Sequence, residues 1–308
     1  MTTSRGGAPR RASRRRADTI GIDAGTSTIR LWTQTAGVTE LTTPPAAIRP
    51  GGERSDTTAA VVTAGRDAIR PQLPRSLRRR RQGFPAVAAV PARASVHGRR
   101  RLRAAIGSLN RGGPVLLMDA PLAAAAGTDL DITGTSPRVV LDVGVHGSEA
   151  AVLADGRVFD AVSCAVGCRE IERAVRSYLY RRHHLLDQPH AAWWALRSTA
   201  DFDIGRDTRG DIGFKPDELA AELHQPISAV VGAVRTASQR ASLRMGKGVL
   251  DDGIVVVGGG AYLRPLREAL RDELATAVIS PPDPRHAVIR GLALFVAEAN
   301  RYPRLWDT

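Results

Sequence analysis

The sequence has few cysteines and no long apolar run. Cys164 and Cys168 are its two cysteines, and a lone C-x3-C pair supplies neither a disulfide framework nor the four ligands of a structural zinc site. No stretch approaches the roughly 20 apolar residues of a membrane-spanning helix, and the N-terminus lacks the apolar segment of a secretion signal. We therefore expect a protein of a reducing, intracellular compartment that is soluble or at most peripheral.

The net charge of +13 is concentrated in three short segments. Residues 1–16, 75–81 and 99–103 carry six, five and four arginines, and the rest of the chain is close to neutral. Such segments can be solvated loops, or they can attract anionic lipid or nucleic acid, and composition leaves these readings open. Residues 1–17 have no periodic apolar pattern, which predicts a disordered Arg-rich arm.

Residues 18–137 alternate predicted strands and helices. Three short β runs come first, with Ala36-Gly37 as a hairpin signal, and strands at 84–91 and 113–121 alternate with helices at 99–110 and 121–130. Residues 51–84 are polar, Pro-containing and basic, and predict a reduced insertion. The alternation favours an α/β fold.

Residues 138–284 repeat this plan. Three β runs with an Asp155-Gly156 hairpin precede a helix at 169–186, and residues 185–215 predict a second reduced insertion. A helix at 215–245, broken near Pro226, precedes a buried strand, a glycine turn and an amphipathic helix. The stretches IGIDAGTSTIRLW and VVLDVGVHGSEAAVL open the two halves in the same way, which predicts two similar domains facing each other across a cleft. We expect the final helix, 285–308, to complete the first domain.

Three turns rich in glycine carry the chemistry. Two lie between paired strands, at 23–28 and 142–149, where consecutive backbone N–H groups can bind an anion and the leading Asp can hold Mg²⁺ through water. The third, at 258–260, lies between a buried strand and a helix N-terminus, where the backbone can closely approach a base or ribose. One such turn is usually an ordinary hairpin, but three together indicate a nucleotide site.

In these turns the sequence resembles the actin-like ATPase superfamily, and within it the MreB/Mbl family. DAPLAAAAG at 119–127 resembles the E-P-M-A-A-A-I-G segment of that family, and VPARASVHGRRRLRAA at 90–105 and DPRHAVIRGLALF at 283–295 are also similar to it. The resemblance runs in order from about residue 18 to the end. It implies an actin-like ATPase fold, with two duplicated RNase H-like α/β domains around a nucleotide cleft and reduced insertion subdomains.

The resemblance implies ATP and Mg²⁺ as ligands. Asp23 and Asp142 would hold Mg²⁺ through water. The implied phosphate-binding residues are Gly25, Thr26, Ser27, Thr28, Gly144, His146, Gly147 and Ser148. The implied adenosine-binding residues are Gly258, Gly259, Gly260, Ala261 and Tyr262, with Trp193 as a further stacking residue.

Two departures from the family pattern affect the site. Val145 and His146 replace glycines of the second loop, and because a β-branched residue disfavours φ > 0 we expect a reshaped turn. His146 could donate to a phosphate when protonated, or be an ordinary turn histidine. The water-positioning Glu of the family corresponds to Ala120, which predicts weak or absent ATPase activity, with neighbouring Asp119 as the candidate catalytic residue.

The implied function is that of an ATP-binding cytoskeletal protein that organises cell shape or cell-wall synthesis at the inner membrane face. Its expected partners are itself, in a filament or dimer, related actin-like proteins, and an anionic membrane surface. At 73–84, where the family carries a membrane-inserting loop, Leu77 and Phe84 are the apolar candidates beside five arginines. Two alternatives stay open: a non-hydrolysing actin-like scaffold or filament modulator, and a nucleic-acid-binding protein that uses the Arg-rich arm.

Overall fold

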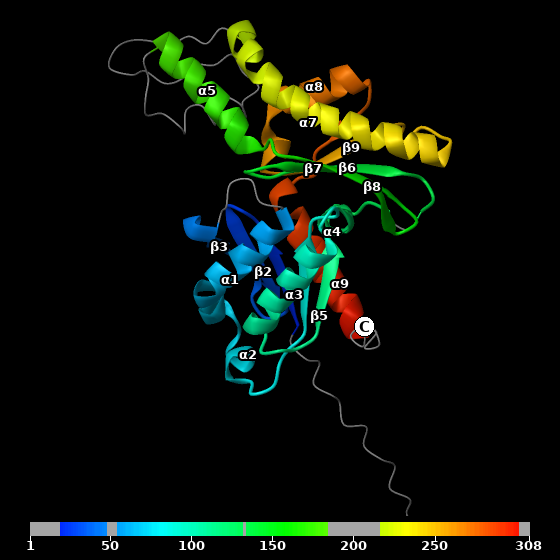
Figure 1. The fold of residues 1–308 in the computed structure, drawn as a ribbon. Coiled ribbons are helices and arrows are strands. Elements are labelled where there is room, and N and C mark those ends of the chain that lie inside the picture. Colours follow the sequence, from blue (N-terminus) through cyan, green and yellow to red (C-terminus); the bar gives the residue numbers. More distant parts are fainter. Residues whose placement is uncertain (1–18, 48–53, 132–133, 184–215, 302–308) are drawn as a thin grey trace, which may run out of the picture.

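The computed structural model describes residues 19–47, 54–131, 134–183 and 216–301 and contains two five-stranded sheets of the same topology (Figure 1). The strand orders are β3-β2-β1-β4-β5 and β8-β7-β6-β9-β10, so each sheet has its first strand at the centre. The predicted internal duplication is therefore confirmed. The first sheet consists of β1 (Ile20–Ala24), β2 (Thr28–Thr33), β3 (Gly37–Thr42), β4 (Ala86–Val90) and β5 (Val115–Asp119). The second consists of β6 (Arg138–Val143), β7 (Ser148–Ala154), β8 (Arg157–Cys164), β9 (Ile254–Gly258) and β10 (Val278–Ile279).

Each sheet combines an antiparallel meander with a parallel part. In the first sheet β1, β2 and β3 pair antiparallel, and β4 and β5 run parallel to β1. In the second, β6, β7 and β8 pair antiparallel, and β9 and β10 run parallel to β6. The carboxyl ends of the parallel strands thus gather at one edge of each sheet, which is where ligands bind in α/β folds.

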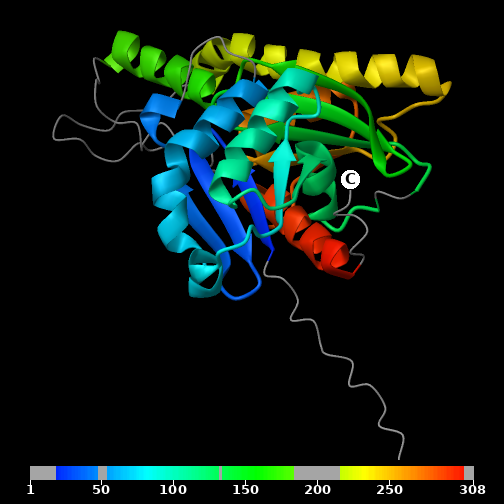
Figure 2. The same cartoon turned by 60° about the horizontal axis from the view of Figure 1, so that its bottom comes forward.

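Helices cover both faces of each sheet. The outer face of the first sheet packs on α1 (Arg54–Gln72) and α3 (Val96–Leu109), and the outer face of the second packs on α5 (Cys168–His183), α7 (Pro216–Met245) and α8 (Arg264–Leu274). Between the two sheets lie α4 (Ala120–Ala126) and α9 (Ala287–Arg301), which share one buried cluster with residues of β4, β6 and β9 (Figure 2). The C-terminal helix α9 also packs on β1 and β2.

The helices α4 and α9 cross at backbone-to-backbone distance. A Cβ atom at Gly127 would lie 1.9 Å from the Ala287 carbonyl oxygen, and one at Gly291 would lie 1.7 Å from the Ala123 carbonyl oxygen. Both positions therefore require glycine, and the two helices form a tight spacer between the sheets.

Residues 54–79 contain two helices that pack in the first core, so the bounds 51–84 predicted for the reduced insertion are too wide. α1 places Val61, Val62 and Ile69 at 0% exposure, and the short α2 (Arg75–Arg79) follows it. The apolar stripe of α1 consists largely of Ala and Val among arginines, so its period is weak in the sequence. The connection between β3 and α1 is limited to residues 43–53, which include η1 (Pro45–Ala47).

The predicted break near Pro226 is also wrong, because α7 continues through it. Leu223, Ile227 and Val230 flank the proline and are buried in the second core. The free energy gained by packing this face of the helix exceeds the cost of the backbone hydrogen bond that the proline cannot make.

The expected arm at 1–17, the expected insertion at 185–215 and Trp193 lie outside the described residues. Two further short helices, η2 (Gly259–Tyr262) and η3 (Pro284–His286), flank α8 and β10. Within the described ranges, no helix has both the length and the apolarity to span a bilayer.

Candidate functional site

The loops after β1 and β6 form the same turn. The Gly25 N–H donates to the Thr28 carbonyl at 3.1 Å, and the Gly144 N–H donates to the Gly147 carbonyl at 2.9 Å. Val145 is not among the described residues with positive φ, so valine fits the turn without strain. The two loops therefore share the same hydrogen bond across the turn.

Asp23 lies at the carboxyl end of β1, opposite Arg30 of β2. Its side chain is 18% exposed and is 3.6 Å from Arg30, which makes a closer ion pair of 2.7 Å with Glu40. Burial raises the pKa of Asp23 to about 6, Arg30 opposes this rise, and the nearby Asp142 adds to it. The two carboxylates predicted to hold a cation are therefore close enough to repel each other.

The arrangement of Asp23 and Asp142 fits Mg²⁺ only together with other oxygen ligands. Within the described part of the chain no group of three or more His, Cys, Asp and Glu side chains could hold a metal ion. Mg²⁺ usually combines one or two carboxylates with water and substrate phosphates. Two carboxylates beside two turns that are predicted to bind phosphate match this donor set.

His146 bridges the two loops. Its Nδ1 lies 2.9 Å from the Thr26 Oγ1 of the first loop, and its Nε2 lies 2.6 Å from Nη1 of Arg169, near the start of α5. Burial and, after it, the Arg169 charge hold the pKa of His146 below its ordinary value. These effects oppose the protonated form of His146 that the sequence left open.

Ser148 does not face the other loop. It is fully buried, and its hydroxyl donates to the Val166 carbonyl at 2.5 Å. Gly147 is buried as well, with the Cys164 carbonyl 2.9 Å from where its Cβ would lie. The Ser148 hydroxyl, predicted to bind phosphate, is thus bonded within the second half. The other predicted phosphate-binding residues, Gly25, Thr26, Ser27, Thr28, Gly144 and His146, all retain exposed area.

The third turn packs directly on the second loop. Gly258 has φ +79°, and a Cβ atom there would lie 2.6 Å from Asp142 Oδ1. A Cβ atom at Gly260 would lie 2.2 Å from Val143 Cγ1. The glycines therefore serve close packing of β9 against β6, and Gly258, Gly259 and Tyr262 keep some exposure. Ala261 is fully buried in the second core, so neither its methyl group nor its backbone has exposed area.

The candidate catalytic residue Asp119 is held by an arginine. Asp119 ends β5, and its Oδ1 accepts from Nη2 of Arg99 at 2.5 Å. Arg99 also donates to the Ala92 and Ala94 carbonyls. Ala120 begins α4 immediately afterwards and carries no polar group that could orient water.

Sequence reasoning missed the role of Glu149. This carboxylate is 2% exposed and accepts from the Ala92 N–H of the first half at 3.2 Å and from the Ser163 hydroxyl at 3.2 Å. It connects the second sheet to the segment after β4. The sequence did contain a signal for this role, namely one carboxylate inside the otherwise apolar strand SEAAVLA. A buried charge requires hydrogen-bond partners, so this position implied a structural contact.

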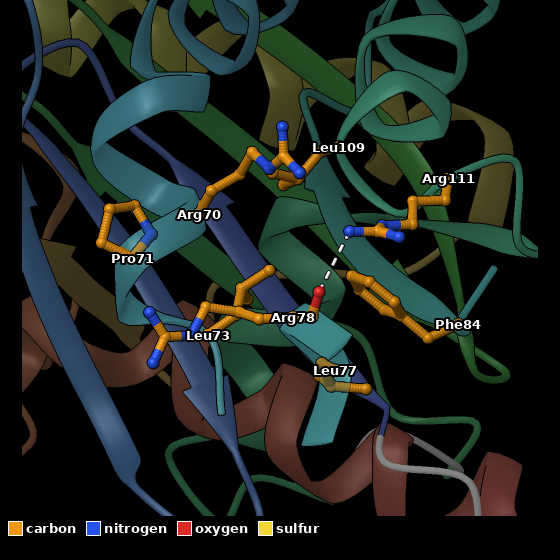
Figure 3. A pocket seen from close by; sticks show the side chains of 8 residues that line it. All are labelled: Arg70, Pro71, Leu73, Leu77, Arg78, Phe84, Leu109 and Arg111. Carbon is orange, nitrogen blue, oxygen red and sulfur yellow. Dashed lines mark hydrogen bonds between the residues drawn. The ribbon is translucent and has the colours of Figure 1, made fainter. Parts of the chain in front are cut away.

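Leu77 and Phe84 are core residues, so the prediction that they contact lipid is wrong. Each is 1% exposed and belongs to the first core. They line a pocket of about 230 Å³ whose rim carries Arg70, Arg78 and Arg111 (Figure 3). The Arg111 guanidinium donates to the carbonyls of Arg78 and Arg80 and fixes this segment. The exposed residues of the segment are polar or charged, and four of them are arginines: Arg75, Arg78, Arg79 and Arg81.

Comparison with known proteins places the chain in a family. The family model described as "MreB/Mbl protein" matches residues 83–192 and 204–304. The chain is 26% identical over 196 residues to the cell shape-determining protein MreB of Escherichia coli, a match that covers 58% of this chain and 55% of that protein. It is 23% identical over 207 residues to the cell shape-determining protein Mbl of Bacillus subtilis, covering 63% and 62%. The match to the first of these relatives thus spans little more than half its length.

Two solved structures share the fold. A crystal structure of MreB5 of Spiroplasma citri bound to ADP superposes with a TM-score of 0.74 at 15% identity, covering 94% of this chain and 98% of that one. A MamK double helical filament gives 0.63 at 17% identity, covering 91% and 98%. The expected actin-like fold is confirmed by these neighbours and by the family match. The chain therefore belongs to the MreB/Mbl family of actin-like, cell shape-determining proteins.

Proposed function

We propose that the chain binds Mg²⁺–ATP between its two halves and organises cell shape or cell-wall synthesis as an actin-like protein. The observation that carries this proposal is the meeting of Asp23 and Asp142, each followed by the same glycine turn, at the facing edges of the two sheets. The ADP-bound relative of the same fold supports a nucleotide as the ligand.

The two loops would divide the binding task. Backbone N–H groups of Thr26 and Ser27 in the first loop and of His146 in the second would bind the phosphates, because successive N–H groups of a turn favour an anion. The N–H groups of Gly25 and Gly144 instead hold the two turns together. Asp23 and Asp142 would hold Mg²⁺ through water. The ion would neutralise the phosphate charge and relieve the repulsion between the two carboxylates.

We propose that hydrolysis is slow or absent. Ala120 replaces the glutamate that the family resemblance assigns to the attacking water, and Asp119 beside it is bonded to Arg99. Positioning of the water is most of what a protein contributes to phosphoryl transfer. The same observation favours a second candidate function, a non-hydrolysing scaffold or filament modulator.

The proposed partners are copies of this chain or related actin-like proteins, and an anionic membrane surface. The filament formed by a protein of the same fold supports self-association. Since Leu77 and Phe84 are buried, attraction to lipid at 73–84 would rest on charge, at about 1 kcal/mol for each basic residue near an anionic surface. Binding to anionic vesicles that weakens steeply with salt, and no binding to neutral vesicles, is the expected result.

Calorimetric titration with Mg²⁺–ATP, with phosphate release followed in the same samples, tests the proposal. We expect saturable binding that Asp23→Asn abolishes and the exposed control Asp67→Asn leaves intact, with little phosphate released. Binding of Mg²⁺–ATP with rapid release of phosphate would show that Ala120 does not prevent hydrolysis, and Asp119 would then be the candidate that positions the water. No binding by the unaltered protein would refute the nucleotide site.

A further inference from the structure

A chain of three polar side chains crosses between the two halves of the protein. It starts at Arg169 near the N-terminus of α5, passes through His146 at the tip of the second loop, and ends at Thr26 in the first loop. The two contacts are 2.6 Å and 2.9 Å long. Thr26 belongs to the turn that the proposed function places on the phosphates.

The two hydrogen bonds that join Arg169, His146 and Thr26 donate in the same direction. A guanidinium has donors and no acceptor, so Arg169 donates to His146 Nε2. A neutral imidazole whose Nε2 accepts carries its proton on Nδ1, and His146 Nδ1–H therefore donates to the Thr26 oxygen. The Thr26 hydroxyl hydrogen is then directed away from His146 and can be donated to an anion.

No neighbouring side chain of the second loop duplicates this role. In the matching turns of the two halves, His146 occupies the place of Ser27 and Val145 the place of Thr26. Val145 is apolar, and the Ser148 hydroxyl is used by the Val166 carbonyl. Residues 144–147, the turn itself, therefore present one polar side chain to the first loop, and it is the one that Arg169 contacts.

Arg169 is well placed to act through His146. Its backbone N–H donates to the Val145 carbonyl at 2.9 Å, so the base of the side chain is fixed to the loop that it serves. Glu170 is engaged elsewhere, by the Gly167 N–H and by Arg173. Arg169 contacts the imidazole directly, and a charge-assisted hydrogen bond of this kind is stronger than a neutral one.

We propose that Arg169 is a positioning residue which, through neutral His146, orients the Thr26 hydroxyl toward the phosphates of a bound nucleotide. The chain of bonds also ties the second half of the protein to the phosphate loop of the first. This inference depends on the proposed nucleotide site for its ligand, whereas its geometry can be tested without one.

Nuclear magnetic resonance of the nitrogen atoms of ¹⁵N-labelled histidine in the nucleotide-free protein tests the geometry. The Nδ1–H tautomer is the less common form of a neutral histidine in water, so its signal is distinctive. We expect His146, assigned by its loss in His146→Asn, to carry the proton on Nδ1 at pH 7, and to change in Arg169→Gln but not in Arg173→Gln. Arg173 is the matched control because it lies one turn further along α5 and pairs with Glu170. A proton on Nε2 in the unaltered protein would overturn the inference.

Calorimetry with Mg²⁺–ADP and Mg²⁺–AMPPNP tests the consequence for binding. We expect Arg169→Gln to weaken binding about tenfold, as the loss of one hydrogen bond to a charged group does. Arg169→Lys retains a charged donor and should recover most of the affinity, and Arg173→Gln should bind like the unaltered protein. If the unaltered protein binds nucleotide and Arg169→Gln binds equally well, the inference fails and the proposed function stands. If the unaltered protein binds no nucleotide, both fail.

Discussion

Replacing Asp23 with asparagine should stabilise the protein at neutral pH. The pKa of Asp23 is raised from 3.8 to about 6, chiefly by burial and against the opposing charge of Arg30. Such a difference corresponds to about 3 kcal/mol by which the folded state disfavours the charged carboxylate. Because the folded pKa lies above the unfolded one, this cost is absent at low pH and grows as the pH rises through both values.

The size of the effect follows from comparing the two forms of the side chain. Near pH 4 the folded protein holds Asp23 protonated, and asparagine is almost isosteric with that form. Near pH 7.5 the charged Asp23 carries the full cost, and asparagine does not. Arg30 remains paired with Glu40 in the variant. The free energy of unfolding of Asp23→Asn relative to the unaltered protein should therefore rise by about 2.5 kcal/mol between these pH values, because the unfolded carboxyl is already partly ionised at pH 4.

Urea denaturation at a series of pH values between 4 and 7.5 measures this difference, without nucleotide or Mg²⁺. Asp67→Asn is the control, because Asp67 is 91% exposed and its substitution should shift stability by less than about 0.5 kcal/mol. Parallel pH curves for Asp23→Asn and the unaltered protein would show that Asp23 is not a strained carboxylate. A large loss of stability at pH 7.5 would show that the ion pair with Arg30 dominates instead.

Three further substitutions, the first with a matched control, test the packing and the contacts between the halves. Gly291→Ala should lower the free energy of unfolding by about 3 kcal/mol, because the added methyl group meets the Ala123 carbonyl. The control Gly232→Ala, with no atom within 4 Å of the added Cβ, should raise it by about 0.5–1 kcal/mol. Equal effects of the two substitutions in urea denaturation would contradict the close crossing of α4 and α9. Glu149→Ala should cost about 3 kcal/mol, because it leaves buried donors, among them the Ala92 N–H, without their acceptor; hydrogen exchange at Ala92 that stays slow would refute this. Leu77→Ala should lower the free energy of unfolding by about 3 kcal/mol, because it leaves a cavity in the core, and it should leave binding to anionic vesicles unchanged. Loss of vesicle binding with normal stability would instead show that Leu77 contacts lipid.

The sequence predicted the strands and loops well because their signals are local. The two turns repeat the same pattern of Asp and Gly between apolar runs, so the duplication could be recognised without coordinates. Asp155-Gly156 supplies positive φ at both residues of its hairpin, as a tight two-residue turn requires. These features depend on residues adjacent in the chain.

The helix α1 and the role of Arg169 escaped prediction for a different reason. The buried face of α1 is made of small residues whose burial depends on α3, more than twenty residues further along the chain. Arg169 is one arginine among many in a basic sequence, and its partner His146 lies in a different element. Contacts of this kind follow from the packing of α5 on the second loop, which no local pattern encodes.

The two halves share the same backbone plan, but they differ in the residue that pairs across the strands with the aspartate before each turn. Arg30 faces Asp23 across the first strand pair, whereas Glu149 faces Asp142 across the second. The first half thus balances its carboxylate within its own sheet, and the second directs an additional carboxylate to the backbone of the first half. One contact between the halves, at Glu149, is deeply buried and charge-assisted, and the other, between His146 and Thr26, is neutral and partly exposed. The neutral bond between His146 and Thr26 therefore costs less to break than the buried bonds that Glu149 accepts.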